Sequence, residues 1–243
     1  MKSFLRKRVP PRLFSFGGLI SGLAVLLIFT SEPVTKVHSS RTFSSKALLC
    51  LGDSYTMGEM VLPNENFPSQ TAQLLHRSGY DFADPEILAK TGWTTDELQN
   101  AVNKYHFKAS YDFVTLLIGV NNQYRERAVE DYKPQFESLL KQAIKLANGK
   151  ADHVIVLSIP DWGVTPFAKD RNRNKIATEI DDYNQANKEI SSAYQVNYID
   201  VTRGTREAAG DLSLLASDGL HPSAKEYARW SEKIYLTIQR YLQ

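Results

Sequence analysis

The feature that most constrains the fold of this chain is the alternation of short apolar runs with amphipathic helical patterns. The runs have the length and composition of buried parallel strands and lie at residues 47–51, 87–89, 113–118, 153–159 and 196–201. The helical patterns place apolar side chains on one face and lie at residues 135–147, 176–194 and 224–242. Such alternation predicts an α/β fold, with a parallel sheet of about five strands between two helical layers.

The first apolar run leads into a strand-to-helix turn, Gly52-Asp53-Ser54. In a parallel sheet, ligands bind beyond the carboxyl ends of the strands, so this turn lies where chemistry is expected. Ser54 could present its hydroxyl there, while the N-terminus of the next helix offers N–H groups to an anion. The same tripeptide also suits a plain helix cap, and alone it leaves both interpretations open.

Two further segments place polar groups beyond strands or before a helix. The third run ends in Gly119-Val120-Asn121, where the asparagine is either an amide donor in the same crevice or an ordinary turn residue. Near the C-terminus, Asp218 precedes His221 by three residues. At that spacing the carboxylate can accept a hydrogen bond from one ring nitrogen, which leaves the other nitrogen as a base.

Together these segments resemble the SGNH hydrolases, the GDSL-type esterase and lipase family, from about residue 47 to residue 241. The residues that match the family's four blocks, in chain order, are Gly52-Asp53-Ser54, Gly92, Gly119-Val120-Asn121, and Asp218 with His221. The sequence departs from the family at Asn122, where the pattern has an aspartate. The resemblance implies a flavodoxin-like three-layer sandwich, a serine mechanism and no metal or other cofactor.

The resemblance also implies a role for each matched residue. Ser54 is expected to be the nucleophile of an esterase, His221 its general base, and Asp218 the group that orients the imidazole. The oxyanion hole is expected to consist of the backbone N–H groups of Ser54 and Gly92 with the side-chain amide of Asn121. The expected substrate is a small-molecule, lipid or glycan ester.

Several aromatic residues follow strand ends or the second block and are candidates for lining a substrate pocket. They are Trp93, Tyr124, Trp162 and Phe167. The segment around Trp162, residues 161–166, has the character of a long functional loop, although surface packing explains it almost as well.

Other functions compete with hydrolysis by this family. A conventional α/β-hydrolase usually places its serine in Gly-x-Ser-x-Gly, but Thr56 occupies the last position here. A metallophosphoesterase could use Asp53, Asn121, Asn122 and His221 as ligands. An O-acyltransferase or a carbohydrate acetylesterase acting on cell-envelope glycans would use the same acyl-enzyme. A glycan-binding module without activity is the remaining alternative.

The N-terminus predicts export. Five basic residues within the first twelve precede an uncharged, largely apolar stretch at 13–30. As a helix it would span roughly 27 Å, close to the hydrocarbon thickness of about 30 Å. Residues 1–30 are therefore expected to be a signal peptide or a signal anchor, residues 31–45 a linker, and residues 46–243 the SGNH hydrolase domain. The domain would then be membrane-anchored, periplasmic or extracellular.

Charge and cysteine content exclude further classes. Residues 1–40 carry six basic residues and one acidic residue, a net charge of +5, so the rest of the chain must carry −3 to reach the total of +2. A body of that charge has no footprint for nucleic acid. The single cysteine, Cys50, excludes an internal disulfide and lies in an apolar run, where a core position is expected.

Overall fold

The computed structural model describes residues 11–15, 17 and 45–242. Most of the predicted signal or anchor segment and most of the predicted linker therefore lie outside the described residues. Within the described part of the chain, none of the helices has the length and hydropathy to cross a bilayer. The chain divides after Thr42, and the unit from Phe43 to Gln243 contains every strand and helix discussed below.

The centre of this unit is a parallel sheet of five strands, as the sequence predicts. The strands are β1 (Leu48–Gly52), β2 (Glu86–Ala89), β3 (Phe113–Leu117), β4 (Val154–Leu157) and β5 (Asn197–Ile199). Their order across the sheet is β2-β1-β3-β4-β5, and each neighbouring pair is parallel. This is a doubly wound strand order. The chain adds β2 on one side of β1 and then crosses to the other side, where it adds β3, β4 and β5.

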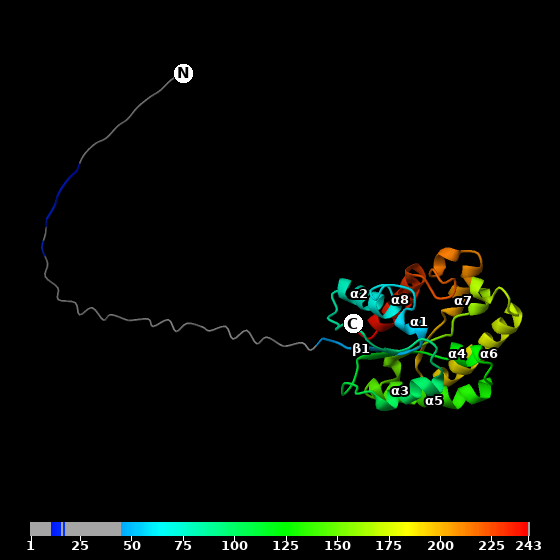
Figure 1. Cartoon of the computed structure of the whole chain (residues 1–243). Helices are drawn as coiled ribbons and strands as arrows, with labels where there is room; N and C mark the ends of the chain where they lie inside the picture. The colour runs from blue at the N-terminus through cyan, green and yellow to red at the C-terminus, as the bar shows by residue number, and fades with distance from the viewer. Residues whose placement is uncertain (1–10, 16, 18–44, 243) are drawn as a thin grey trace, which may run out of the picture. The chain divides into compact units, whose positions relative to one another are not determined.

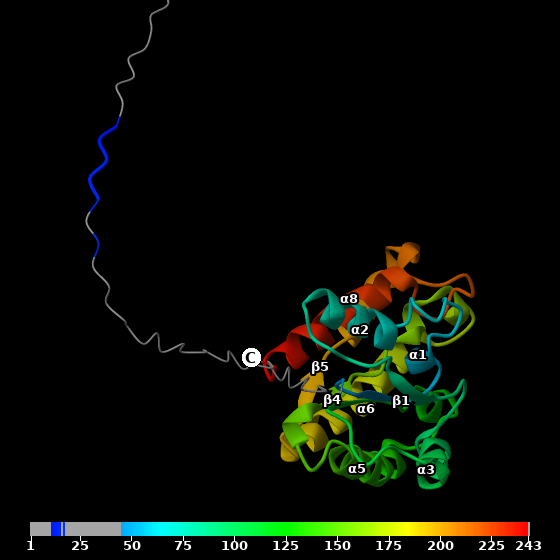
Figure 2. The same ribbon diagram turned by 90° about the vertical axis from the view of Figure 1, so that its left-hand side faces the viewer.

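Helices cover both faces of the sheet. In chain order they are α1 (Ser54–Met57), α2 (Phe67–Arg77), α3 (Thr95–Lys104), α4 (Val120–Tyr124), α5 (Val129–Leu146), α6 (Arg173–Ala193), α7 (Thr202–Thr205) and α8 (Ala224–Gln239). Helices α2 and α8 lie on one face, and α3, α5 and α6 on the other (Figures 1 and 2). The predicted three-layer sandwich is confirmed, although the helical patterns of the sequence do not include α2 and α3.

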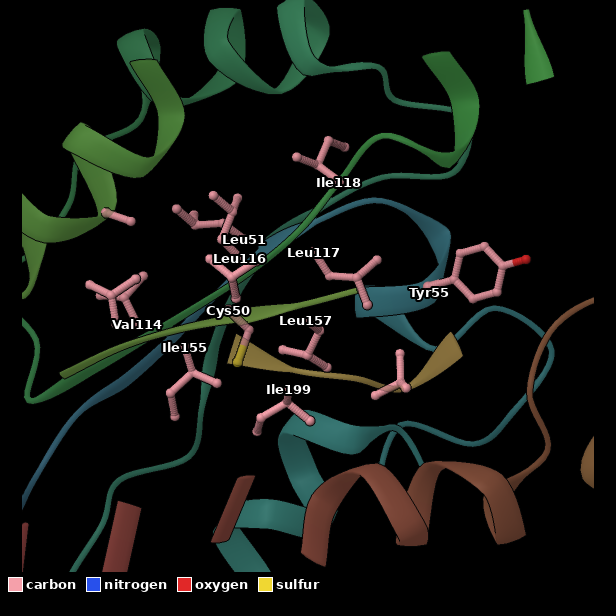
Figure 3. Packing of buried hydrophobic residues seen from close by; sticks show 14 of the residues in the cluster. Cys50, Leu51, Tyr55, Val114, Leu116, Leu117, Ile118, Ile155, Leu157 and Ile199 are labelled. Carbon is pink, nitrogen blue, oxygen red and sulfur yellow. The ribbon is translucent and has the colours of Figure 1, made fainter. Parts of the chain in front are cut away.

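Side-chain alternation along the strands fills both layers of the core. Cys50 and Ile155 point toward the face covered by α2 and α8, whereas Leu51 and Leu116 point toward the opposite face (Figure 3). All four are fully buried, and the register aligns Leu51 with Leu116 across β1 and β3. Cys50 is thus a core residue, as predicted, and burial raises the pKa of its thiol to about 12.

Local signals start the helices that flank the sheet. The side chain of Asn66 accepts a hydrogen bond from the N–H of Ser69 and caps α2. Helix α3 begins with a capping box, in which Thr94 and Glu97 satisfy each other's backbone N–H groups. Because the capping box anchors the start of α3 directly after β2, it also fixes one end of the loop that crosses the carboxyl edge of the sheet.

The end of β3 requires a glycine. Gly119 has φ +131°, and a Cβ atom there would lie 2.7 Å from a ring atom of Tyr132 and 2.7 Å from Ile159. Only a residue without a side chain allows this approach and this backbone conformation. The tight turn starts α4 immediately after the strand and holds Asn121 at the carboxyl edge of the sheet.

Candidate active site

Ser54 lies at the start of α1, directly beyond the carboxyl end of β1. Its side chain is buried at the bottom of a pocket, with 4% of the residue exposed. Asp53 caps the helix by accepting a hydrogen bond of 3.0 Å from the N–H of Tyr55. Ser54 is the first helical residue, so its own N–H has no intrahelical partner and finds no acceptor among residues 45–242. The serine therefore presents both a hydroxyl and a free N–H group.

The structure joins Ser54 to the Asp218–His221 pair in one hydrogen-bonded chain. Nε2 of His221 lies 3.0 Å from Oγ of Ser54, although 167 residues separate the two in sequence. Nδ1 of His221 lies 2.6 Å from Oδ2 of Asp218. An ionised carboxylate only accepts hydrogen bonds, so it places the ring proton on Nδ1 and leaves Nε2 as an acceptor toward the serine.

Asp218 is held in its ionised form. Burial alone would raise its pKa, but hydrogen bonds from the His221 ring and from the N–H groups of Leu220 and His221 outweigh that effect. The net result is a pKa below the ordinary value for aspartate. The same two N–H bonds, of 3.0 and 3.1 Å, fold residues 218–221 into a tight loop that orients the imidazole.

Neighbouring elements brace the imidazole from two sides. The ring of Tyr55 packs against His221 with 5.3 Å between centroids. The loop after β4 contacts the loop of residues 218–221, because the N–H of Phe167 donates to the carbonyl of Gly219 at 3.3 Å. The position of His221 thus depends on segments that follow β1 and β4 as well as on its own loop.

Gly92 occupies a turn that faces the same pocket. The N–H of Trp93 donates to the carbonyl of Lys90 at 3.2 Å, and Gly92 has φ +83°. A positive φ at the third position is what a type II turn requires, which explains a glycine here. The turn's own hydrogen bond does not use the N–H of Gly92, and no acceptor within residues 45–242 takes it.

Asn121 approaches this turn from α4. Its Nδ2 donates a hydrogen bond of 3.0 Å to the carbonyl of Trp93. An amide nitrogen carries two hydrogens, so the second remains available toward the pocket that Asn121 lines. Ser54, Gly92 and Asn121 therefore each contribute one uncommitted N–H donor around the same space.

The pocket above Ser54 has a volume of about 190 Å³. Its lining consists of Ser54, Tyr55, Thr91, Gly92, Val120, Asn121, Tyr124, Trp162, Phe167, Leu220 and His221. Apart from His221 it contains no side chain that can carry a charge near neutral pH. Several of these residues were not singled out from the sequence, but Tyr55, Val120 and Leu220 each adjoin a matched motif residue, and that adjacency is the signal that could have identified them.

Three predicted aromatic residues meet at the pocket. Trp162 is buried and forms edge contacts with Tyr124 and Phe167, whose centroids lie 5.3 and 5.9 Å away. The indole N–H of Trp162 donates to Oε1 of Gln123 at 2.7 Å, which fixes the ring. Tyr124 and Phe167 are 43% and 46% exposed and form the rim.

The fourth predicted aromatic residue, Trp93, is not part of the lining. Its side chain packs against the hydrophobic core, and its carbonyl accepts the hydrogen bond from Asn121. Its side chain is partly buried. The prediction that Trp93 lines the pocket, which rested on its position next to Gly92 in the sequence, is therefore wrong.

Asn122, which a metal site would use as a ligand, is committed elsewhere. Its Oδ1 accepts from the N–H of Thr95 at 3.0 Å, and its Nδ2 donates to Oγ1 of the same residue at 2.7 Å. Within residues 11–15, 17 and 45–242, no three His, Cys, Asp or Glu side chains gather as metal ligands would.

The buried carboxyl group of Asp53 makes the stability of the protein depend on pH. The carboxyl group is fully buried, and its Oδ2 has no hydrogen-bond partner among the described residues. Burial raises its pKa to about 7, well above the ordinary value for aspartate. The folded protein thus binds more protons here than the unfolded chain between about pH 4 and pH 7, so this group lowers stability as the pH rises through that window.

We expect Asp53→Asn to gain stability relative to the wild type as the pH rises from 4 to 8, because an amide keeps the cap to Tyr55 without burying a charge. Urea unfolding of both proteins at several pH values measures the difference in free energy of unfolding. A difference that stays constant across this range would contradict the assignment.

Comparison with known proteins places this site in a family. The model of the GDSL-like lipase/acylhydrolase family matches residues 50–229, well over half of the chain. A search of curated protein sequences finds no match.

Solved structures share the fold at low identity. A lipase/acylhydrolase from Enterococcus faecalis is 21% identical, with 80% of this chain and 95% of that chain covered and a TM-score of 0.65. An acetylxylan esterase from Geobacillus stearothermophilus, Axe2, is 19% identical, with 80% and 94% covered and a TM-score of 0.61. An esterase from Pseudoalteromonas sp., EstA, is 16% identical, with 82% and 99% covered and a TM-score of 0.59.

The match spans the strand-to-helix turn at Ser54, the turn at Gly92 and the segment after β3, as well as the loop of Asp218 and His221. The chain belongs to the GDSL-like lipase/acylhydrolase family, a family of carboxylic ester hydrolases.

Proposed function

We propose that this protein is a serine esterase that forms an acyl-enzyme on Ser54. The observation that carries the proposal is the chain of two hydrogen bonds, 3.0 and 2.6 Å long, from Ser54 through His221 to Asp218 at the bottom of a pocket. His221 takes the proton of the serine as Oγ attacks the ester carbonyl, and Asp218 stabilises the charged imidazole. His221 then protonates the departing alcohol and activates the water that releases the acid.

The negative oxygen of the tetrahedral intermediate needs donors that are free before substrate binds. The N–H groups of Ser54 and Gly92 and the second amide hydrogen of Asn121 meet this need, each for a different local reason. Donors held in place by a helix start, a turn and a carbonyl do not have to reorganise during the reaction. One such donor raises the reaction rate by a factor of about 10²–10³.

The pocket supports a short, uncharged acyl group. Its volume of about 190 Å³ is below the range of about 300–1,000 Å³ typical of pockets that enclose drug-sized ligands. Trp162 is buried and anchored to Gln123, so it closes the pocket as a rigid wall. The alcohol part of the substrate then lies outside, along the exposed rings of Tyr124 and Phe167.

The rim favours a second, narrower candidate, a carbohydrate acetylesterase or an O-acyltransferase acting on glycans. Exposed aromatic rings beside a small acyl pocket suit a sugar ester, and one protein of the same fold is described as an acetylxylan esterase. Transfer and hydrolysis differ only in whether a sugar hydroxyl or water attacks the acyl-enzyme.

The nucleophile is tested by substitution and labelling. We expect Ser54→Ala to lose at least 10³-fold in kcat for an aryl acetate, since the residual rate then comes from binding and the oxyanion donors alone. A fluorophosphonate probe should label the wild type but not the variant. Wild-type turnover by Ser54→Ala would refute the acyl-enzyme.

The acyl preference is tested with a panel of aryl esters from acetyl to palmitoyl, together with acetylated xylo-oligosaccharides. We expect kcat/KM to be highest for acetyl and butyryl esters and to fall with longer chains. Trp162→Leu should shift the optimum to longer chains because it removes the rigid wall, whereas Phe167→Leu, at the rim, should leave the optimum unchanged. A wild-type optimum at palmitoyl would contradict the proposed acyl size.

Mass spectrometry of products with a glycan acceptor distinguishes transfer from hydrolysis.

We also propose that the protein is exported, on the basis of the basic cluster and the apolar stretch at residues 13–30. Expression of the full chain in a bacterium, followed by fractionation, should place the enzyme outside the cytoplasm, either bound to the membrane or released. A variant in which the first five basic residues are replaced by serine should be exported less efficiently, because it lacks the basic cluster. Recovery of the wild type in the cytoplasm would contradict the proposal.

A further inference from the structure

We infer that Arg125 is a positioning residue. Its guanidinium group links the turn containing Gly92 to α4 and α3 and so fixes the positions of the oxyanion donors relative to one another. The inference rests on the proposed function, because it concerns donors that act in ester hydrolysis. It adds a residue that belongs to none of the family blocks matched in the sequence.

The contacts of Arg125 are specific. Its Nη2 donates to the carbonyl of Gly92 at 2.7 Å and lies 3.4 Å from Oε2 of Glu97. Its own N–H donates to the carbonyl of Asn121 at 3.1 Å, so the residue closes the last turn of α4. One side chain thus links the helix that carries one oxyanion donor to the turn that carries another.

The turn is held by two neighbouring carbonyls. Asn121 binds the carbonyl of Trp93, and Arg125 binds that of Gly92. Asn121 and Arg125 are four residues apart, a spacing that places both side chains on the same side of a helical segment. Two successive peptide groups of the turn are therefore fastened to the same side of α4.

Glu97 provides a fixed point behind the guanidinium group. Its Oε2 accepts hydrogen bonds from the N–H of Thr94 at 2.9 Å and from Oγ1 of Thr94 at 3.0 Å. These bonds from Thr94, with a smaller effect of the positive charge of Arg125, lower the pKa of Glu97. The carboxylate that faces Arg125 is thus charged and already held by the capping box of α3.

At Gly92 itself, few neighbouring side chains restrain the turn. A Cβ atom built on Gly92 would meet only one atom within 4 Å, Nη2 of Arg125 at 3.8 Å. A glycine backbone without packed neighbours can rotate, and rotation about Gly92 would swing its N–H away from the oxyanion. The flanks of the turn are held separately, because Oγ1 of Thr91 donates to Glu59 and the side chain of Trp93 packs against the core. At Gly92 itself, the hydrogen bond from Arg125 is the restraint that a side chain supplies.

Stability alone does not account for this arrangement. Arg125 and Glu97 are 42% and 40% exposed, and ion pairs with such exposure contribute little to folding. Arg127 offers a matched comparison, because it spans the same junction to α3 through Asp96 at 2.5 Å but does not contact the turn of Gly92.

The test compares Arg125→Ala, Arg125→Lys and the control Arg127→Ala in the full-length protein. We expect Arg125→Ala to lower kcat for an aryl acetate about tenfold with KM changed less than about twofold, a smaller loss than the 10²–10³ expected for removing a donor such as Asn121. Affinity for a boronic acid, which forms a tetrahedral anion on the serine, should fall by the same factor. Arg125→Lys should recover part of kcat, and methylguanidine should partly rescue Arg125→Ala. Arg127→Ala should retain wild-type kcat and boronate affinity.

Two results would overturn the role of Arg125 while leaving the esterase proposal intact. One is wild-type kcat and boronate affinity in Arg125→Ala when Ser54→Ala is inactive. The other is loss of the folded circular dichroism spectrum in Arg125→Ala, because the contact would then serve folding. Activity in Ser54→Ala, by contrast, would refute the proposed function itself, so the two failures are distinguishable.

Discussion

The pairing of β1 with its two parallel neighbours determines where Ser54, Gly92 and Asn121 can lie. Gly52, at the end of β1, is in register with Ala89 of β2 and with Leu117 of β3. Because the three strands end level, the residues just beyond them emerge at one edge of the sheet. Ser54 follows two residues after this line, Gly92 three and Asn121 four. Groups far apart in sequence are thus brought to one edge of the sheet by the backbone hydrogen bonding of the strands.

The edge of the sheet positions the donors, and α4 fastens them. Asn121 holds the carbonyl of Trp93, and Asn122 binds both the N–H and the hydroxyl of Thr95. An amide suits position 122 because it accepts one of these bonds and donates the other. A carboxylate, which the family pattern has here, could only accept. The departure from the pattern is therefore compatible with the same local structure, formed without a buried charge.

The loop after β4 links the pocket to His221. Asp161 starts it, accepting from the N–H of Gly163 at 2.8 Å and pairing with Arg206 at 2.8 Å. Trp162 follows as the wall of the pocket, and the N–H of Phe167 reaches the carbonyl of Gly219 in the histidine loop. A change in this loop would alter both the space in the pocket and the support of His221. The loop thus contributes to the pocket, a position that the sequence left in balance with plain surface packing.

The sequence by itself determined the class of fold and the identity of the motif residues. Apolar runs of strand length and the order of the matched blocks are local patterns, and local patterns are legible without a structure. Helices α2 and α3 were missed because, at 11 and 10 residues, each contains fewer repeats of the apolar pattern than the longer helices. Only the tertiary structure decided that Trp93 faces the core, that the pocket is small, and that Arg125 reaches Gly92. Each of these depends on contacts between residues that are distant in the chain or on one backbone angle at a glycine, and neither leaves a periodic trace in the sequence.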